Sequence, residues 1–232
     1  MSGLVESAAA ILGASERRLE TISNNVSNIS TPGFKRQIDF NEVLSVQHDN
    51  TIRSTRFDPA QGKLSKSDNS LDLAISGVAF FQLRSGKEFF YSRQGQFRLA
   101  DDGTVVTPQG YVVQQSGGGD LILENPNIDV LEDGTVLDHG QPVARIGLFA
   151  IADHDSLRSV GGSLFTAEQG HMQEASGSQL RQGMIEMSNV SLGDEMVGMM
   201  EALRQAESGA RLTQVYDDLI GRAITTLGQG GR

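Results

Sequence analysis

Residues 22–36 read Ile22-Ser23-Asn24-Asn25-Val26-Ser27-Asn28-Ile29-Ser30-Thr31-Pro32-Gly33-Phe34-Lys35-Arg36, and this stretch decides how the chain begins. Asparagine lowers helix propensity, so three of them at the end of a predicted helix indicate amides that bond elsewhere. We expect their partners to be other chains. Pro32 ends the predicted helix and Gly33 permits a left-handed bend, so we predict that the chain changes direction here.

The residues before this turn form one long predicted helix. Its apolar residues recur at spacings of four and three, which is typical of a coiled-coil seam, here about 40 Å long. The seam consists of Val5, Ala8, Leu12, Ser15, Leu19, Ile22, Val26 and Ile29. Packing on the chain's own domain is one interpretation. We favour burial by other copies, because the first turns also carry apolar residues off the seam.

A second long helix is predicted at the other end of the chain, over residues 188–232. Ser191 is a plausible N-cap, and Asp194 and Glu195 suit the positive end of the helix dipole. The predicted packing face consists of Leu192, Met196, Met199, Leu203, Ala206, Ala210, Thr213, Asp217, Ile220, Ile224 and Leu227. Apolar residues off this face, such as Val197 and Met200, widen the surface beyond one contact.

The sequence between the helices changes character twice. Residues 35–69 predict an extended connector with a short helical turn near residues 41–46, and its mild basic bias fits either a solvated linker or docking on an acidic neighbour. From residue 70 the pattern becomes that of short strands joined by tight turns. Asp102-Gly103 and Asp133-Gly134 each predict a hairpin turn.

These patterns predict an α+β fold. Terminal helices pair in a coiled-coil-like inner domain, and a central all-β domain forms a small barrel or a sandwich of hairpins. The predicted division is residues 1–34 for the N-terminal helix, 35–69 for the connector, 70–187 for the β domain and 188–232 for the C-terminal helix.

Composition excludes several classes of protein. The chain of 232 residues has no cysteine and a formal charge of −10, of which residues 70–188 carry −8, so a nucleic-acid surface is not expected. No basic leader precedes the first apolar run, and no run is long enough to span a membrane. The protein is therefore either soluble or exported by a route without a cleavable signal peptide.

Catalytic and metal-binding patterns are also missing. The four histidines, at 48, 139, 154 and 171, are dispersed, and we interpret them as surface loop residues. The carboxylate pairs at 101–102 and 132–133 resemble those of glycosidases, but each precedes Gly-Thr in a predicted turn. We predict no catalytic residue, no metal site, no cofactor and no small-molecule substrate.

Residues 24–35 resemble at every position the N-terminal signature of the bacterial flagellar axial family of rod, hook and hook-associated proteins. That signature reads roughly Asn-Asn-(Ile/Val)-(Ala/Ser)-Asn-x-x-Thr-x-Gly-(Phe/Tyr)-(Lys/Arg). Other signatures of the family are similar to residues 71–81, 91–97, 106–111 and 188–190. In the first of these stretches, Ala79 replaces a glycine that is usual in the family. The resemblance implies an assembly motif of Asn24, Asn25, Asn28, Thr31, Gly33, Phe34 and Lys35.

The resemblance also implies a function. Family members polymerise through their terminal helices into a tubular drive shaft that transmits torque and surrounds an export channel. The implied partners are other copies, related rod proteins on the hook side and on the membrane-ring side, and the flagellar type III export apparatus. The implied location is the basal-body rod that spans the periplasm.

Within the family, the length and the short connector are most similar to the proximal rod subunits, with the distal rod as the alternative. A peptidoglycan-acting enzyme and a secreted coiled-coil adhesin are alternatives from other classes. Cell-wall hydrolysis would indicate the enzyme, and function that survives loss of residues 1–34 would indicate the adhesin.

Overall fold

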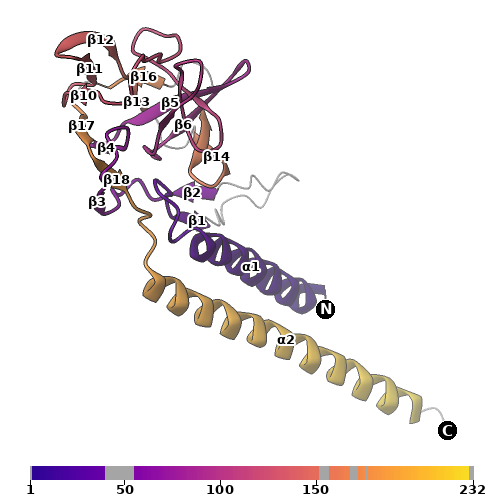
Figure 1. Cartoon of the computed structure of the whole chain (residues 1–232). Coiled ribbons are helices and arrows are strands. Elements are labelled where there is room, and N and C mark those ends of the chain that lie inside the picture. Colours follow the sequence, from indigo (N-terminus) through magenta and orange to yellow (C-terminus); the bar gives the residue numbers. More distant parts are fainter. Residues whose placement is uncertain (1, 40–54, 152–156, 168–171, 176, 230–232) are drawn as a thin grey trace. The chain divides into compact units, whose positions relative to one another are not determined.

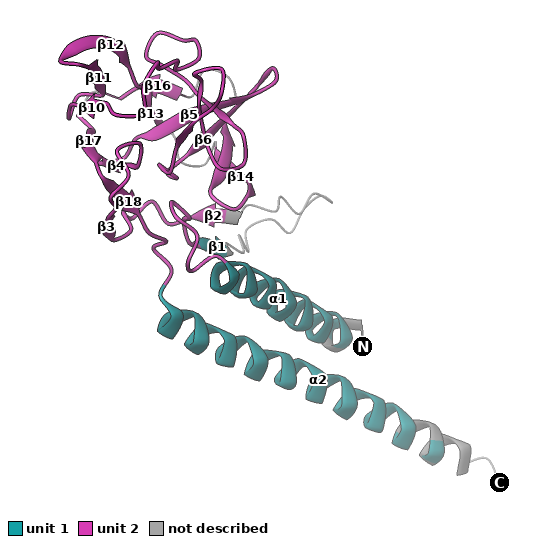
Figure 2. Cartoon of the chain, in the orientation of Figure 1, with its two compact units in different colours: residues 1–27, 37–54, 191–232 teal, residues 28–36, 55–190 magenta. Residues whose placement is uncertain are grey.

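The computed structural model describes residues 2–39, 55–151, 157–167, 172–175 and 177–229 (Figure 1). By its contacts the chain divides into two units, coloured separately in Figure 2. Unit 1 comprises residues 1–27, 37–54 and 191–232, and unit 2 comprises residues 28–36 and 55–190. A helix at each end and strands between them confirm the predicted α+β class. The predicted helical turn at 41–46 lies outside the described residues.

The contact division differs from the boundaries expected from the sequence. Residues 28–36 include the end of the predicted first helix and the start of the predicted connector, whereas by contacts they belong to unit 2. Residues 55–69 of the predicted connector belong to unit 2 as well, where they include strands β2 (Thr55–Phe57) and β3 (Leu64–Lys66). The β unit therefore takes in chain from both sides of residues 37–54.

Unit 1 contains the helices α1 (Ser2–Ser27) and α2 (Leu192–Gln229), together with strand β1 (Gln37–Asp39). The first helix ends earlier than expected, so Ile29 lies in the following turn and not on the helix seam. The Ser27 hydroxyl donates to the Asn24 carbonyl at 2.9 Å, a local bond that competes with helix continuation. Ser191 directly precedes α2, and its carbonyl accepts from the Glu195 amide at 3.0 Å, as expected for an N-cap position.

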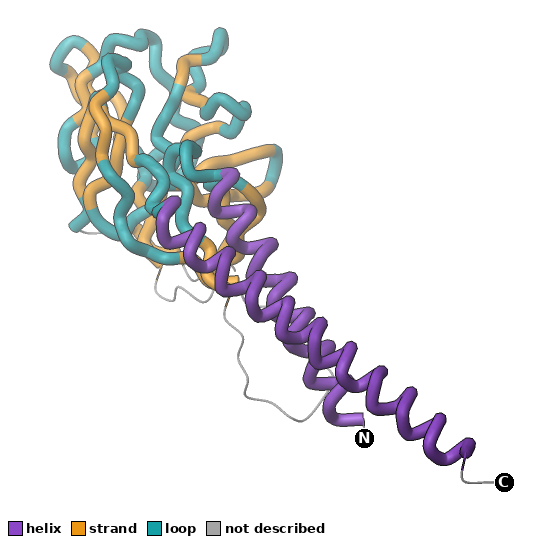
Figure 3. The backbone as a smooth tube through the Cα atoms, turned by 90° about the horizontal axis from the view of Figure 1, so that it is seen from below, coloured by secondary structure: helices purple, strands orange, loops and turns teal. Residues whose placement is uncertain are grey.

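The two helices lie side by side and run antiparallel (Figure 3). A Cβ atom added to Gly198 would lie 3.3 Å from Ile22 Cδ1, and one added to Gly209 would lie 3.1 Å from Leu12 Cγ. Between these points Arg18 pairs with Glu201 at 2.6 Å. Buried positions recur every seven residues along both helices, at Ala8, Ser15 and Ile22 on α1 and at Glu195, Ala202 and Gly209 on α2.

The largest antiparallel sheet of unit 2 runs in the order β14-β15-β6-β5-β9-β8-β7, and β13 pairs with both β5 and β16. In its centre Phe81 lies opposite Ser92, and Leu83 lies opposite Phe90. The strands of this sheet are β5 (Phe80–Ser85), β6 (Glu88–Ser92), β7 (Arg98–Leu99), β8 (Val105–Val106), β9 (Val112–Val113), β13 (Leu148–Ile151), β14 (Leu157–Gly161), β15 (Leu164–Ala167) and β16 (Met172–Glu174).

Smaller antiparallel sheets complete unit 2. Strand β11 pairs with β10 and β12, β17 pairs with β4, and β18 pairs with β3. The last of these pairings places Glu186 opposite Leu64. The strands are β4 (Leu73–Ser76), β10 (Asp129–Val130), β11 (Thr135–Asp138), β12 (Gln141–Arg145), β17 (Gln179–Gln182) and β18 (Met184–Glu186).

The described residues of unit 2 form two hydrophobic clusters. The larger one contains Phe81, Leu83 and Leu180, which are all but fully buried. The smaller one gathers Phe57, Phe80 and Phe165, and the ring centroids of Phe57 and Phe165 are 5.1 Å apart. Phe57 therefore fixes part of the predicted connector to the β unit.

The predicted hairpin turns are confirmed. Gly103 and Gly134 adopt φ values of +82° and +90°. In each turn the preceding aspartate accepts from the backbone amide and the hydroxyl of the following threonine. These bonds hold the pKa of the Asp102 and Asp133 carboxyl groups below the ordinary value.

Candidate functional site

The predicted seam of α1 is only partly covered within one chain. Ala8, Ser15 and Ile22 are buried against α2, and Leu19, Val26 and Ile29 are half-buried. Val5 and Leu12 are exposed. Val5 and part of Leu12 therefore stay accessible to water within one chain, although Leu12 also approaches Gly209 of α2.

Helix α2 turns a different face to α1 than its apolar pattern suggests. Its buried positions are Glu195, Ala202 and Gly209. Of the predicted packing residues, Leu192, Met196, Leu203 and Ile220 are exposed, and Met199 and Ala206 are half-buried. The side chains of Ile224 and Leu227 lie outside the described residues.

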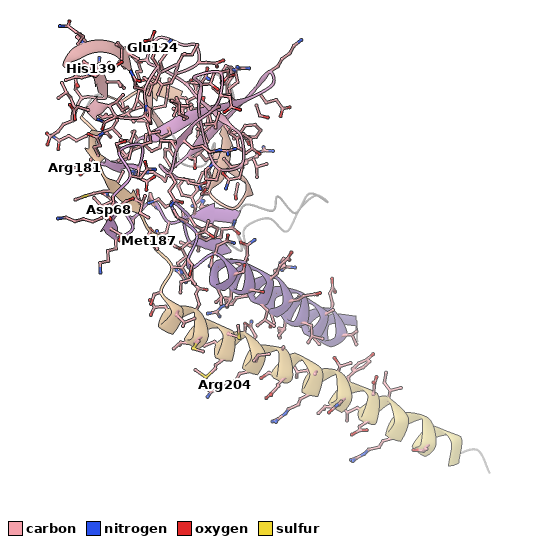
Figure 4. All side chains as sticks on the ribbon, viewed as in Figure 1. Asp68, Glu124, His139, Arg181, Met187 and Arg204 are labelled. Carbon is pink, nitrogen blue, oxygen red and sulfur yellow. The ribbon has the colours of Figure 1, made fainter. Side chains whose placement is uncertain are left out.

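We call Leu192, Met196, Met200 and Leu203 the exposed stripe. Their spacing places them on one flank of the first turns of α2, and their exposed fractions are 46%, 57%, 53% and 48%. The residue after Leu203 is charged: Arg204 projects from the helix in Figure 4. The exposed stripe is thus an apolar surface that one chain leaves in water.

The motif asparagines have bonds within the chain itself. Asn25 is 1% exposed; its Oδ1 accepts from the Gln37 amide at 2.8 Å, and its Nδ2 donates to the Gln37 carbonyl at 2.9 Å. Asn28 Oδ1 accepts from the Thr31 hydroxyl at 3.1 Å. The expectation that these amides bond to other chains is therefore wrong for Asn25, which fixes its own chain after the turn. Asn24 is exposed.

The Gly33-Phe34-Lys35 part of the motif is buried in unit 2. Gly33 has a φ of +70°, and a Cβ atom there would lie 2.2 Å from the Gln94 nitrogen. Its amide donates to the Glu186 carbonyl at 2.8 Å. Phe34 is 1% exposed. Only glycine fits at residue 33, because the turn lies directly on the backbone of Arg93 and Gln94.

Lys35 completes the turn by entering a buried ionic cluster. Its Nζ atom lies 2.7 Å from Glu186 Oε1 and donates to the Ala60 carbonyl at 2.7 Å. Arg93 Nη1 lies 3.4 Å from Glu186 Oε2. All three charged side chains are at most 1% exposed. Burial lowers the pKa of the Lys35 ammonium, and the Glu186 carboxylate opposes this change.

Asn189, from the signature at residues 188–190, bonds to the chain directly after the N-terminal signature at residues 24–35. Its Oδ1 accepts from the Arg36 amide at 2.6 Å, and its Nδ2 donates to the carbonyls of Asp58 and Ala60. Sequence reasoning matched Asn189 to a family signature but assigned it no contact. Glu186 was missed altogether, because no periodic pattern marks a buried carboxylate whose partner is 151 residues away.

The described residues offer no catalytic arrangement. His139 is exposed at the β11–β12 turn, as expected, and the other three histidines lie outside the described residues. The part of the chain that the structure describes holds no group of acidic or histidine side chains able to bind a metal ion. Within the same residues, neither helix has an apolar window suited to crossing a membrane.

Three family models match consecutive parts of the chain. Residues 12–35 match the model described as flagella basal body rod protein. Residues 74–138 match the flagellar hook protein FlgE/F/G D1 domain, and residues 181–226 match the flagellar basal body rod FlgEFG protein C-terminal region. The matched parts include the turn motif, the central strands and most of α2.

Whole-length relatives agree with these matches. The flagellar basal-body rod protein FlgG of Borreliella burgdorferi is 30% identical over 253 residues, covering 93% of this chain and 95% of the relative. The rod protein FlgF of Rhizobium meliloti is 30% identical over 230 residues, covering 93% of each chain. FlgF of Caulobacter vibrioides is 29% identical over 231 residues, covering 92% of this chain and 93% of the relative.

Proposed function

Because the chain belongs to the flagellar basal-body rod protein family, whose members are structural proteins of the basal body, we propose that it is a subunit of the proximal rod. In this role it polymerises through its terminal helices into a tube that transmits torque and surrounds the export channel. Its partners are further copies, the adjoining rod proteins on the hook and membrane-ring sides, and the export apparatus that delivers it. The rod spans the periplasm.

The exposed stripe of α2 is the observation that carries the assembly proposal. Fully burying a leucine or methionine side chain contributes about 1.5–3 kcal/mol, and each of the four residues is about half exposed. Covering the stripe would therefore contribute about 4 kcal/mol before the cost of association. If these four side chains were buried within the chain, α2 would present little apolar surface to neighbouring subunits.

Alignment length supports the proximal assignment over the distal one. The FlgF relatives align over 230 and 231 residues, close to the length of this chain, whereas FlgG aligns over 253 residues at nearly the same coverage. The FlgG relative is therefore longer than this chain. We propose that the difference lies in the connector. The distal rod remains the alternative within the family.

A charge placed on the exposed stripe tests assembly. We expect Leu203→Glu to fold normally as a monomer, because Leu203 is 48% exposed, but to be absent from isolated basal bodies. The control is Gln205→Glu, which adds the same charge at an exposed position about 200° around the helix. Incorporation of both variants at the wild-type level would contradict the proposed role of the stripe.

Locating the subunit tests the proximal assignment separately. Density for this chain in isolated basal bodies is expected next to the membrane ring. Density in the hook-side part of the rod would favour the distal alternative and leave the assembly proposal intact.

A further inference from the structure

We call residues 31–36 the strap. Contacts with residues that are distant in the sequence hold the strap against the rest of unit 2. The Gly33 amide donates to the Glu186 carbonyl, and Gly33 lies against the backbone of Arg93 and Gln94. The Arg36 carbonyl accepts from the Asp58 amide at 2.8 Å. No regular strand pairing holds residues 31–36, so their position depends on these specific contacts.

Glu186 is the residue that these contacts share. Its Oε1 accepts from Lys35 Nζ at 2.7 Å and from the Gly62 amide at 2.9 Å, and its Oε2 faces Arg93. Gly62 lies close to the chain just after β18, because a Cβ atom there would be 1.9 Å from the carbonyl oxygen of Met187, labelled in Figure 4. The strap, the segment before β3, Arg93 and the end of β18 therefore meet at one carboxylate.

The charges in this cluster are unequal. Two buried cations, Lys35 and Arg93, face one buried carboxylate, with Asp58 as a further acidic group near Lys35. Arg93 has additional support from the Ile75 carbonyl and from the Phe80 ring, whose centroid is 5.2 Å from its guanidinium carbon. Loss of the Glu186 charge would leave Arg93 without a carboxylate and Lys35 with Asp58 as its acidic neighbour, whereas loss of the Lys35 charge would leave Arg93 and Glu186 as a balanced pair.

We propose that Glu186 is the closing contact of the strap. The strap docks only when β18 has paired with β3 and has brought the Glu186 carboxylate beneath Lys35 and Gly62. Closure of unit 2 therefore requires the two segments nearest to its ends, 151 residues apart in the sequence. Until both are in place the strap stays open while the central sheet is formed. This inference does not depend on the assembly of the protein.

Amide hydrogen exchange on the full chain tests the proposal. We expect Glu186→Gln to accelerate exchange at least tenfold in residues 31–36 and 60–63, because Lys35 loses the charge that holds the strap and the Gly62 amide loses its carboxylate acceptor. Amides of β5 should exchange at the wild-type rate. The control is Glu132→Gln, the same substitution in an exposed ion pair with Arg181, which should change neither region.

Lys35→Met provides the second variant. It leaves Arg93 to balance the carboxylate, so the strap should exchange faster than in the wild type but more slowly than in Glu186→Gln. If Glu186→Gln does not fold, Lys35→Met alone must accelerate the strap and spare β5. Equal acceleration of the strap and β5, or unchanged exchange of the strap, would overturn the proposal.

Discussion

Replacing Gly33 by alanine should destabilise unit 2 far more than the same replacement at Gly86. Alanine in the left-handed region costs about 1 kcal/mol. The new Cβ atom would also lie 2.2 Å from the Gln94 nitrogen and 2.4 Å from the Arg93 carbonyl carbon, both of them backbone atoms. Backbone displacement of this kind costs about 1–3 kcal/mol, and a weakened bond from the Gly33 amide to Glu186 about 1 kcal/mol more. We expect a total loss of about 4 kcal/mol.

Gly86 is the matched control for this substitution. Its φ is +60°, close to the +70° of Gly33, and nothing lies within 4 Å of its added Cβ atom. Gly86→Ala therefore has the backbone cost alone, about 1 kcal/mol. The difference between the two variants, about 3 kcal/mol, measures the close approach of the turn to its neighbour.

Urea unfolding of the full chain measures this difference. The protein has no tryptophan, so near-ultraviolet circular dichroism of its tyrosines, two of which lie in unit 2, reports the packing of that unit. For a slope of about 2 kcal/mol per molar urea, a 3 kcal/mol difference separates the two midpoints by about 1.5 M. Equal midpoints for the two variants would refute the close-approach argument.

Three other substitutions test separate contacts. Hydrogen bonds from Arg84, and then from Gln114, hold the pKa of Asp120 below its ordinary value, so its contribution to stability is present above about pH 4 and is lost as pH falls through the lowered pKa. Asp120→Asn should thus destabilise unit 2 at pH 7 and differ less from the wild type in acid unfolding curves. Phe81→Ala should cost about 3–5 kcal/mol in urea unfolding, against under 1 kcal/mol for the exposed Phe89→Ala. Asn25→Ala removes two backbone hydrogen bonds and should cost about 2 kcal/mol in thermal unfolding followed by far-ultraviolet circular dichroism.

Local sequence patterns predicted much of the fold. The four-three spacing located both terminal helices, and Asp-Gly pairs located the turns at Gly103 and Gly134, because each depends on neighbouring residues alone. The sequence predicts an end of α1 later than Ser27, where the helix ends. Serine and asparagine weaken a helix gradually, so helix propensity does not locate the last helical residue to within one or two positions. The barrel or sandwich arrangement of the strands stays a prediction.

Contacts between distant residues were not predictable in the same way. Hydrophobic periodicity marks the faces of a helix that carry large apolar residues, but it does not say which element covers them. On α2 it selected Leu192 and Met196, whereas the face toward α1 carries Ala202 and Gly209, which periodicity overlooks because they are small. Glu186 escaped notice for a related reason: a buried charge is recognised by its partners, and those come from remote parts of the chain.

The interleaving of the two units has a mechanical consequence. The chain passes from one unit to the other four times, at residues 27–28, 36–37, 54–55 and 190–191. Each helix of unit 1 is therefore joined to unit 2 by a peptide link of its own, at residues 27–28 for α1 and 190–191 for α2. A cut at either of these two links would leave the other helix covalently joined to unit 2.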